Sequence, residues 1–132
     1  MTRFDVVAGV ILQEGNILCV QKAQSKRDYI SLKWEFPGGK VEQGEECVKA
    51  LEREIGEELH LGIGNVEFLI TVEHTYPDFH LVMHAYTCAI SSGEPVLTEH
   101  VDLKWLSVYE LDQLDWAAAD IPIVEKLMSG RG

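Results

Sequence analysis

Three glutamates that lie close together in the sequence are the residues best able to do chemistry. Glu54, Glu57 and Glu58 stand at positions i, i+3 and i+4, a spacing that places three carboxylates on one face of a helix within a turn. Like charges this close destabilise an isolated helix, and only Arg53 and Lys49 are near enough in the sequence to compensate them. Divalent cations that prefer oxygen ligands, Mg²⁺ or Mn²⁺, would offset the repulsion and retain water molecules for a reaction. The alternative is a plain charged helix face exposed to solvent.

The helix that must carry these glutamates is predicted over residues 45–59. Apolar residues recur there at helical spacing, so the helix would bury an apolar stripe. Gly38 and Gly39 precede the helix and follow a short apolar strand that contains Trp34 and Phe36. Paired glycines permit a backbone turn that other residues resist. They also let backbone carbonyls face a metal ion or a phosphate with no side chain in the way, so a turn and a binding site are compatible here.

Residues 39–61 resemble the Nudix box. The segment begins with Gly39, has Glu45 six residues later, and contains the run Arg-Glu-x-x-Glu-Glu that starts at Arg53. This pattern runs over 23 residues and fixes several chemically distinct positions. One position departs from it, because His60 stands where the family has glycine, at the residue expected to end the helix in the left-handed conformation. The resemblance implies metal-assisted hydrolysis of a diphosphate linkage.

Further matches indicate one branch of this family. The run from Trp34 to Glu42 looks like the lead-in of MutT-type enzymes, which hydrolyse nucleoside triphosphates to monophosphate and pyrophosphate. The runs at residues 98–100 and 119–125 look like the CTP pyrophosphohydrolase relatives of MutT. The implied function is Mg²⁺-dependent hydrolysis of nucleoside or deoxynucleoside triphosphates, for sanitation of the nucleotide pool, with 8-oxo-dGTP, CTP or modified dCTP as substrate. Two alternatives are a broad-specificity pyrophosphatase of nucleoside diphosphate derivatives and a Nudix module that binds a nucleotide without hydrolysing it.

The resemblance also implies which residues hold the metal and move the proton. The metal ligands would be the carbonyl oxygen of Gly39 and three carboxylates, those of Glu54, Glu57 and Glu58. Glu99 matches a glutamate outside the box that approaches the metal and the water from a mobile loop. One carboxylate would accept the proton of the attacking water, and Glu54, Glu58 and Glu99 are all candidates for this general base.

Other positions are implied to orient the helix or to bind the substrate. Arg53 is a further residue on which catalysis would depend, since it is expected to pair with Glu45 and so orient the loop and the helix. Lys40 matches a lysine near the phosphates, and Lys22 matches an arginine whose bidentate fork a lysine lacks. Tyr76 is the last residue of a predicted strand, and with Phe79 it flanks the turn that follows and could border a base pocket. The predicted substrate-binding residues are Lys22, Phe36, Lys40, Tyr76 and Asp120.

Asp120 has two interpretations. It precedes the last predicted helix and could cap that helix, since aspartate is a favoured N-cap. It also matches the position that reads the base edge, where MutT has asparagine. An ionised carboxylate only accepts hydrogen bonds and suits the donors of a guanine edge. A protonated carboxyl offers a donor beside an acceptor and suits cytosine or adenine, and burial would favour that state.

The charge of the chain limits its partners. It has 22 acidic and 11 basic side chains, a formal net charge of −11, so it does not attract a nucleic acid polymer. The expected partner is a free nucleotide, which is also an anion and would be repelled unless cations bridge it to the glutamates. Acidity can also serve solubility alone, and both interpretations are compatible.

The cysteines and histidines predict no further site. Cys19, Cys47 and Cys88 are widely spaced and odd in number, which argues against a disulfide framework and favours a reducing cytoplasm. They are expected to be small buried residues. The histidines, His100 among them, lack the spacing of metal ligands and are expected on the surface or on strand faces.

Length and pattern predict one domain of the α+β class. A chain of 132 residues has room for one core, so residues 1–132 are expected to form a single Nudix hydrolase domain, as a monomer or a weak homodimer. The strands are predicted at residues 4–12, 17–21, 66–76, 80–90 and 101–106, and the helices at 45–59 and 121–128. These elements indicate a mixed β-sheet sandwiched between helices (α-β-α), which is also the Nudix fold. No membrane contact is expected, since no apolar run reaches the roughly 18 residues of a spanning helix.

Overall fold

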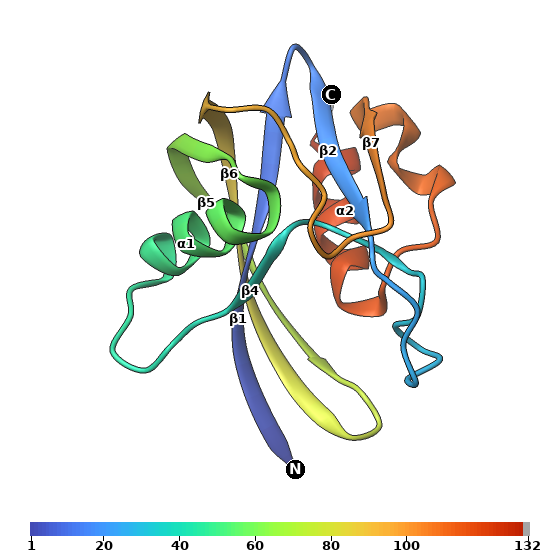
Figure 1. The fold of residues 1–132 in the computed structure, drawn as a ribbon. Coiled ribbons are helices and arrows are strands. Elements are labelled where there is room, and N and C mark those ends of the chain that lie inside the picture. The colour runs from blue at the N-terminus through green and yellow to red at the C-terminus, as the bar shows by residue number, and fades with distance from the viewer. Residues whose placement is uncertain (131–132) are drawn as a thin grey trace.

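The computed structural model describes residues 1–130 and is built around one seven-stranded sheet (Figure 1). The strands are β1 (Thr2–Gln13), β2 (Asn16–Gln21), β3 (Trp34–Glu35), β4 (Gly38–Lys40), β5 (Gly62–Thr75), β6 (Phe79–Ser92) and β7 (Asp102–Leu106). The helices are α1 (Cys47–Leu59) and α2 (Ile121–Ser129), and two short 3₁₀ helices cover Val108–Gln113 and Ala118–Asp120.

Strand β1 requires a layer on each side of the sheet. Val7 and Ile11 belong to one apolar cluster and Ala8 and Val10 to another, and all four are buried. The first cluster also contains the apolar stripe of α1, and the second contains residues of α2. Since successive side chains of a strand point to opposite faces, α1 covers one face of the sheet and α2 the other. The predicted α-β-α arrangement is confirmed.

Strand β1 pairs with β6 along one edge and with two different strands, β2 and β4, along the other. The strand order is β3-β2-β1-β6-β5, with β1 parallel to β6 and the other pairs antiparallel. On its other edge β1 pairs with β2 only at its last two residues, and with β4 at Val6–Ala8. β1 and β2 therefore diverge, and residues 34–40 cross from β3, beside β2, to β4, beside β1. This crossing segment brings the sequence before the Nudix-like box into the sheet.

The two glycines of β4 are needed for close approach. The prediction that they form a turn is wrong, since Gly38 and Gly39 pair with β1 and neither has a positive φ. A Cβ atom on Gly38 would overlap the carbonyl oxygen of Val7, and one on Gly39 would overlap the carboxylate of Glu54. Glycine is therefore required at position 38, where the backbone of β4 lies directly against β1, whereas at position 39 the Glu54 side chain of α1 would have to move aside.

Helix α1 ends in the conformation that the sequence predicts. It begins at Cys47, two residues later than expected, and buries Ala50, Leu51 and Ile55 against the sheet. His60 closes it in the left-handed region, with φ 58° and ψ 37°, and its N–H donates a hydrogen bond to the carbonyl of Gly56. A residue with a Cβ atom takes this conformation at a cost, so His60 is the strained end of the helix.

The cysteines are free, as predicted. Cys19 and Cys88 are buried, and burial raises the pKa of each thiol to about 12. Cys47 is only half-buried, because it stands in the first turn of α1, so the prediction of three buried cysteines is wrong for this residue. No helix within residues 1–130 is long and apolar enough to cross a membrane.

Candidate active site

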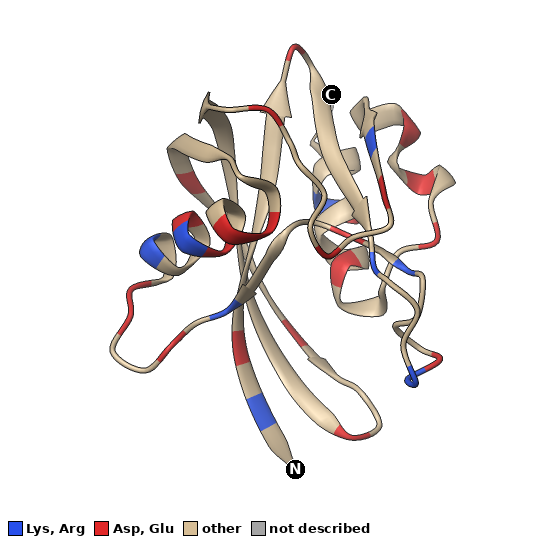
Figure 2. Ribbon diagram, viewed as in Figure 1, with Lys and Arg blue, Asp and Glu red and all other residues tan. Residues whose placement is uncertain are grey.

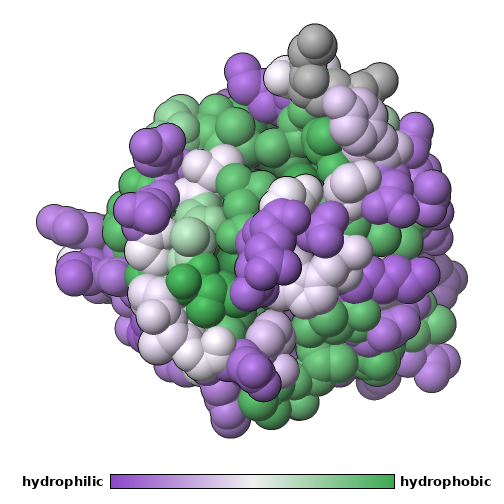
Figure 3. All heavy atoms as spheres, turned by 90° about the horizontal axis from the view of Figure 1, so that it is seen from above, coloured by the Kyte–Doolittle hydropathy of each residue, from purple (hydrophilic) through white to green (hydrophobic). Residues whose placement is uncertain are grey.

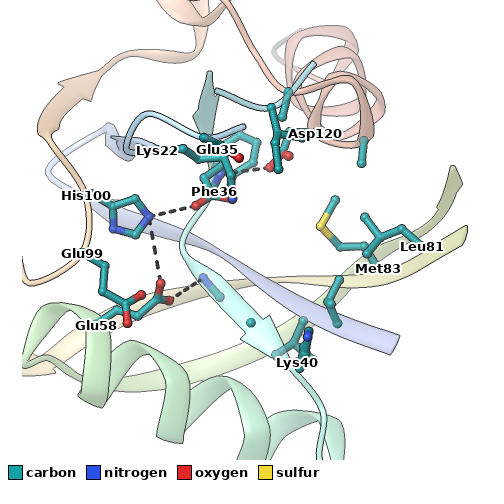
Figure 4. A pocket seen from close by; sticks show the side chains of 18 of the residues that line it. Lys22, Glu35, Phe36, Lys40, Glu58, Leu81, Met83, Glu99, His100 and Asp120 are labelled. Carbon is teal, nitrogen blue, oxygen red and sulfur yellow. Dashed lines mark hydrogen bonds and ion pairs between the residues drawn. The ribbon is translucent and has the colours of Figure 1, made fainter. Parts of the chain in front are cut away.

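A cavity of about 440 Å³ lies where β1 and β2 diverge, and its two ends differ in chemistry (Figure 4). One end is acidic and contains Glu35, Glu58, Glu99 and His100. The other end is mostly apolar and contains Phe36, Tyr76, Leu81, Met83 and Asp120. The predicted site residues that line the cavity are Lys22, Phe36, Gly39, Lys40, Glu58, Tyr76, Glu99 and Asp120, whereas Arg53, Glu54 and Glu57 lie outside the lining.

Glu58 is the buried acid of the acidic end. Its Oε1 accepts a hydrogen bond of 3.2 Å from the N–H of Gly38, and the residue is 7 % exposed. Burial, and then the negative charges of Glu35, Glu99 and Glu54, raises the pKa of Glu58 to about 9. Glu58 therefore keeps its proton at neutral pH unless a positive charge binds beside it.

Arg53 fixes the start of α1 to the loop before it. Its Nε and Nη2 donate to the two carboxylate oxygens of Glu45 at 2.9 and 3.0 Å, and Nη2 also donates to the carbonyl of Lys40. Its Nη1 donates to Glu54 at 2.8 Å. The hydrogen bonds from Arg53 lower the pKa of Glu45 to about 2. The contact predicted between Arg53 and Glu45 is present, and it holds Glu54 against β4 as well.

Glu57 stands apart from the other two helix glutamates. Its side chain is 63 % exposed, and its Oε2 lies 3.5 Å from Nη1 of Arg53. Within residues 1–130, no three acidic, histidine or cysteine side chains form a complete set of metal ligands. The common helix face predicted from the spacing is real, but Arg53 draws Glu54 and Glu57 to one side while Glu58 points into the cavity.

Glu35 is a half-buried charge that links the two ends of the cavity. Its Oε2 accepts a hydrogen bond of 2.8 Å from Nε2 of His100, and its Oε1 lies 3.3 Å from Nζ of Lys22. Burial works to raise the pKa of Glu35, but the hydrogen bond from His100 and the charge of Lys22 outweigh it and lower that pKa. Glu35 is therefore ionised, and the Lys22 side chain is held by it rather than pointing freely at a ligand.

Asp120 lies at the apolar end and does not cap α2. Its Oδ1 accepts a 3.0 Å hydrogen bond from the N–H of Phe36, and no side-chain cap bond reaches the helix. The residue is 5 % exposed. Burial, and then the charge of Glu35, raises the pKa of Asp120 well above its usual range. The prediction of a helix cap is wrong, because the carboxyl of Asp120 accepts its hydrogen bond from the backbone of the crossing segment instead of from the helix.

Aromatic rings and a surface loop close the apolar end. The ring of Phe36 stacks on Trp116 with centroids 4.6 Å apart. The hydroxyl of Tyr76 accepts a 3.0 Å hydrogen bond from the N–H of Ala119, and burial raises the pKa of that hydroxyl. Tyr29, in the loop between β2 and β3, stacks on Tyr76 at 5.2 Å. This loop is further tied down because Arg27 and Tyr29 both donate hydrogen bonds to Asp78 in the β5–β6 turn.

The model of the NUDIX domain family matches residues 2–127. The chain belongs to the NUDIX domain family. The predictions of this family and of its fold are therefore confirmed.

Two relatives of this Nudix protein come from Escherichia coli K12. It is 37 % identical over 132 residues to a protein named CTP pyrophosphohydrolase, covering 99 % of this chain and 96 % of the relative. It is 28 % identical over 127 residues to a protein named 8-oxo-dGTP diphosphatase, covering 96 % and 98 %. A crystal structure of a MutT NUDIX hydrolase from Burkholderia pseudomallei is 27 % identical, with a TM-score of 0.84 over 96 % of this chain and 98 % of that chain. The predicted enzyme class agrees with these names.

The donors at the acidic end of the Nudix domain fit a hard divalent cation in kind. Glu58 and Glu54 offer carboxylates beside the backbone of Gly39, and such oxygen donors are the ligands that Mg²⁺ and Mn²⁺ prefer. Glu35 and Glu99 add negative charge that raises the pKa of Glu58. The same charge that favours a proton on Glu58 would favour a cation in its place.

His100 and Glu35 are the residues that the sequence analysis missed. The prediction that His100 lies on the surface or on a strand face is wrong, since its side chain is 3 % exposed and contacts Glu35. The sequence contained one signal for Glu35, because this glutamate stands between two aromatic residues, Trp34 and Phe36. Both of these are buried in the structure, and Glu35 ends the very short strand β3. No signal of spacing connects His100 with Glu35, 65 residues apart.

Proposed function

We propose that this Nudix domain hydrolyses nucleoside or deoxynucleoside triphosphates to monophosphate and pyrophosphate with Mg²⁺ as cofactor. The observation that carries the proposal is the cavity itself, with an acidic end suited to a cation and an apolar end suited to a base. The names of the relatives support this reaction class. Hydrolases of this family generally need a divalent metal, and Mn²⁺ is the second metal to test. The biological role would be sanitation of the nucleotide pool.

In the proposed reaction, the oxygen of a water molecule forms a bond to phosphorus and the bridging P–O bond between the α- and β-phosphates breaks. A bound cation would lower the pKa of that water and neutralise charge on the phosphate oxygens. Lys40 lines the cavity with its ammonium 4.2 Å from the ring centroid of Phe4, where it could meet a phosphate. Of the predicted general bases, we favour Glu99, because Arg53 already holds Glu54 and burial raises the pKa of Glu58.

We further propose that Asp120 reads the base in its protonated form. A protonated carboxyl offers an O–H donor beside an acceptor oxygen, which matches the ring nitrogen and amino group of cytosine or adenine. The direction of its pKa shift supports this state. Cytosine triphosphates, modified or not, are therefore the favoured substrates, and 8-oxo-dGTP is the second candidate.

The test of the function is a screen of purified protein with Mg²⁺, in which products are identified by chromatography. Substrates are CTP, a modified dCTP, 8-oxo-dGTP and several nucleoside diphosphate derivatives. Monophosphate and pyrophosphate in equal amounts from a triphosphate support the proposal, and Glu58→Gln should abolish their formation. Cleavage restricted to the diphosphate derivatives would show a broad-specificity pyrophosphatase, and binding without any turnover would show a nucleotide-binding module.

Asp120→Asn tests the protonated state of Asp120. Asparagine offers a donor beside an acceptor, as the protonated acid does, so the ratio of kcat/KM between CTP and 8-oxo-dGTP should change by less than about threefold near neutral pH. Asp120→Leu is the control that offers neither group, and it should lower kcat/KM for CTP at least about tenfold. A change of about tenfold or more in the ratio for Asp120→Asn would mean that Asp120 is ionised.

We also propose the roles given above for the individual site residues. We further propose that residues 1–132 form a single domain, that the protein is a monomer or weak homodimer, and that it is located in the cytoplasm. The net charge of −11 argues against a nucleic acid polymer as the partner, and the names of the relatives support a free nucleotide.

A further inference from the structure

The segment that carries Glu99 is held at points along its length although it has no regular secondary structure. We define the Glu99 segment as residues 93–101, which lead from β6 past the end of α1 to β7. The N–H of Val96 donates to the carbonyl of Leu59 at 2.9 Å, and the N–H of Val101 donates to the carbonyl of Gln21 at 3.0 Å. The segment therefore joins the end of α1 to the end of β2, across the acidic end of the cavity.

Two side chains fix the residues on either side of Glu99. The hydroxyl of Thr98 donates a 2.7 Å hydrogen bond to the carbonyl of Glu58, in the last turn of α1. Nε2 of His100 donates a 2.8 Å hydrogen bond to the carboxylate of Glu35, in β3. Glu99 itself is exposed on one side and lies beside Glu58 (Figure 4).

The two anchors differ in strength. Glu35 is ionised and His100 is buried, and a hydrogen bond to a charged acceptor away from water is stronger than one between neutral groups. Within the described part of the chain, Nδ1 of His100 has no hydrogen-bond partner, so the polar attachment of this side chain passes through Nε2. The Thr98 hydroxyl makes a neutral hydrogen bond at a more exposed place. His100 is thus the principal anchor.

We propose that His100 is a positioning residue that, with Thr98, clamps the Glu99 segment so that the Glu99 carboxyl faces the cavity beside Glu58. This inference rests on the proposed function, in which Glu99 accepts the proton of the attacking water. Unlike the mobile loop that the resemblance implies, this segment holds Glu99 in place before any substrate binds, because the residues on both sides of Glu99 are attached to the scaffold. His100 acts through Glu99 and Glu35 and is not itself a group that reacts.

The kinetic test compares two variants of His100. His100→Leu keeps apolar bulk but removes the donor, and it should lower kcat for the best triphosphate at least about tenfold with KM within about threefold. His100→Gln keeps an N–H donor on the side chain and should restore kcat to within about threefold of the wild type. A kcat for His100→Leu within about twofold of the wild type would overturn the proposal, and so would a glutamine variant as impaired as the leucine variant.

A second measurement needs neither metal nor substrate. Hydrogen exchange of the protein without added metal should show the Val101 amide exchanging at least about tenfold faster in His100→Leu than in the wild type. The Val96 amide, held by Leu59, is the internal control and should change by less than about threefold. Equal protection of Val101 in the two proteins would show that His100 does not clamp the segment.

These measurements also separate the clamp from the proposed function. If the wild-type protein hydrolyses no triphosphate, the proposed function is wrong, and the exchange rates alone decide whether the clamp exists. If His100→Leu does not fold, Thr98→Val tests the same clamp from the side of α1. Its kcat should fall at least about threefold with KM unchanged, and an unchanged kcat would then overturn the proposal.

Discussion

Glu57 and Glu58 are neighbours in α1 with opposite surroundings. Glu58 is buried and points into the cavity. The Glu57 side chain is 63 % exposed, and its Oε2 lies 3.5 Å from Nη1 of Arg53. Both are predicted metal ligands, so a substitution at either residue tests the metal site. A substitution at Glu57 should affect catalysis without affecting folding, because an exposed ion pair contributes little to the free energy of unfolding.

Glu57→Gln should therefore lower turnover with little effect on folding. We expect kcat with saturating Mg²⁺ to fall at least about a hundredfold, since a carboxylate ligand would be lost. The free energy of unfolding should change by less than about 0.5 kcal/mol. Steady-state kinetics and thermal melting measure the two quantities. Glu52→Gln on the same helix, which loses an exposed pair with Lys49, is the matched control and should leave kcat unchanged; near-normal turnover of Glu57→Gln would remove Glu57 from the metal site.

At the scale of elements, the end of α1 and the start of the Glu99 segment depend on each other. His60 is left-handed with φ 58°, and Gly93 lies against it with φ +87°. A Cβ atom on Gly93 would stand 2.7 Å from the carbonyl oxygen of His60. His60 therefore has a backbone conformation that disfavours a residue with a Cβ atom, and Gly93 has one that requires glycine.

Two substitutions at this junction should have opposite effects on stability. His60→Gly should leave the free energy of unfolding unchanged or raise it by up to about 1 kcal/mol, since it relieves the left-handed conformation and keeps the hydrogen bond to Gly56. Gly93→Ala should lower the free energy of unfolding by more than about 1 kcal/mol, because the added methyl group would overlap the backbone carbonyl oxygen of His60. Urea unfolding of both variants measures these changes. A loss of kcat in His60→Gly at unchanged stability would reveal a functional role for His60.

At the scale of the whole molecule, acidity is distributed and not confined to the cavity. Acidic residues (red in Figure 2) lie on helices, strands and loops, and basic residues (blue) are fewer. Hydrophobic and hydrophilic areas alternate on the face shown in Figure 3. The most exposed apolar side chains include Phe68 on β5, Val101 before β7 and Tyr109 in a 3₁₀ helix. The dependence of stability on pH should therefore reflect both the overall charge of the protein and its buried acids.

The buried acids predict that stability falls as pH rises. The pKa of Glu58 is raised from about 4.5 to about 9 in the folded protein, and that of Asp120 is also raised. Between those pH values the folded state holds protons that the unfolded state releases, so the free energy of unfolding decreases with pH. The melting temperature without added metal should be lower at pH 8 than at pH 5 by several degrees.

Two additions check that Glu58 is the cause. Glu58→Gln cannot release a proton, so its melting temperature should depend less on pH over the same range. Mg²⁺ requires the ionised carboxylate, and its stabilising effect on the wild type should therefore be larger at pH 8 than at pH 5. A melting temperature of the wild type that rises between pH 5 and pH 8 would contradict the burial of a protonated Glu58.

Several local features of this protein follow from its sequence alone. The periodicity of α1, the left-handed end at His60 and the pairing of Arg53 with Glu45 depend on residues within one or two helical turns of each other or on a single tight loop. The family followed from the box because its positions are fixed relative to one another in the chain. The α-β-α layering followed from the mixture of predicted strands with two predicted helices.

Contacts between residues that are far apart in the sequence could not be predicted and depend on the tertiary fold. Glu35 and His100 are 65 residues apart and Phe36 and Asp120 are 84 apart, and no periodicity connects positions on different elements. Burial of this cavity sets the protonation of Glu58 and Asp120, because desolvation depends on what surrounds a carboxyl and not on its neighbours in sequence. The role of Gly38 was likewise misread, since the need for glycine came from the carbonyl of Val7 in another strand and not from a local turn.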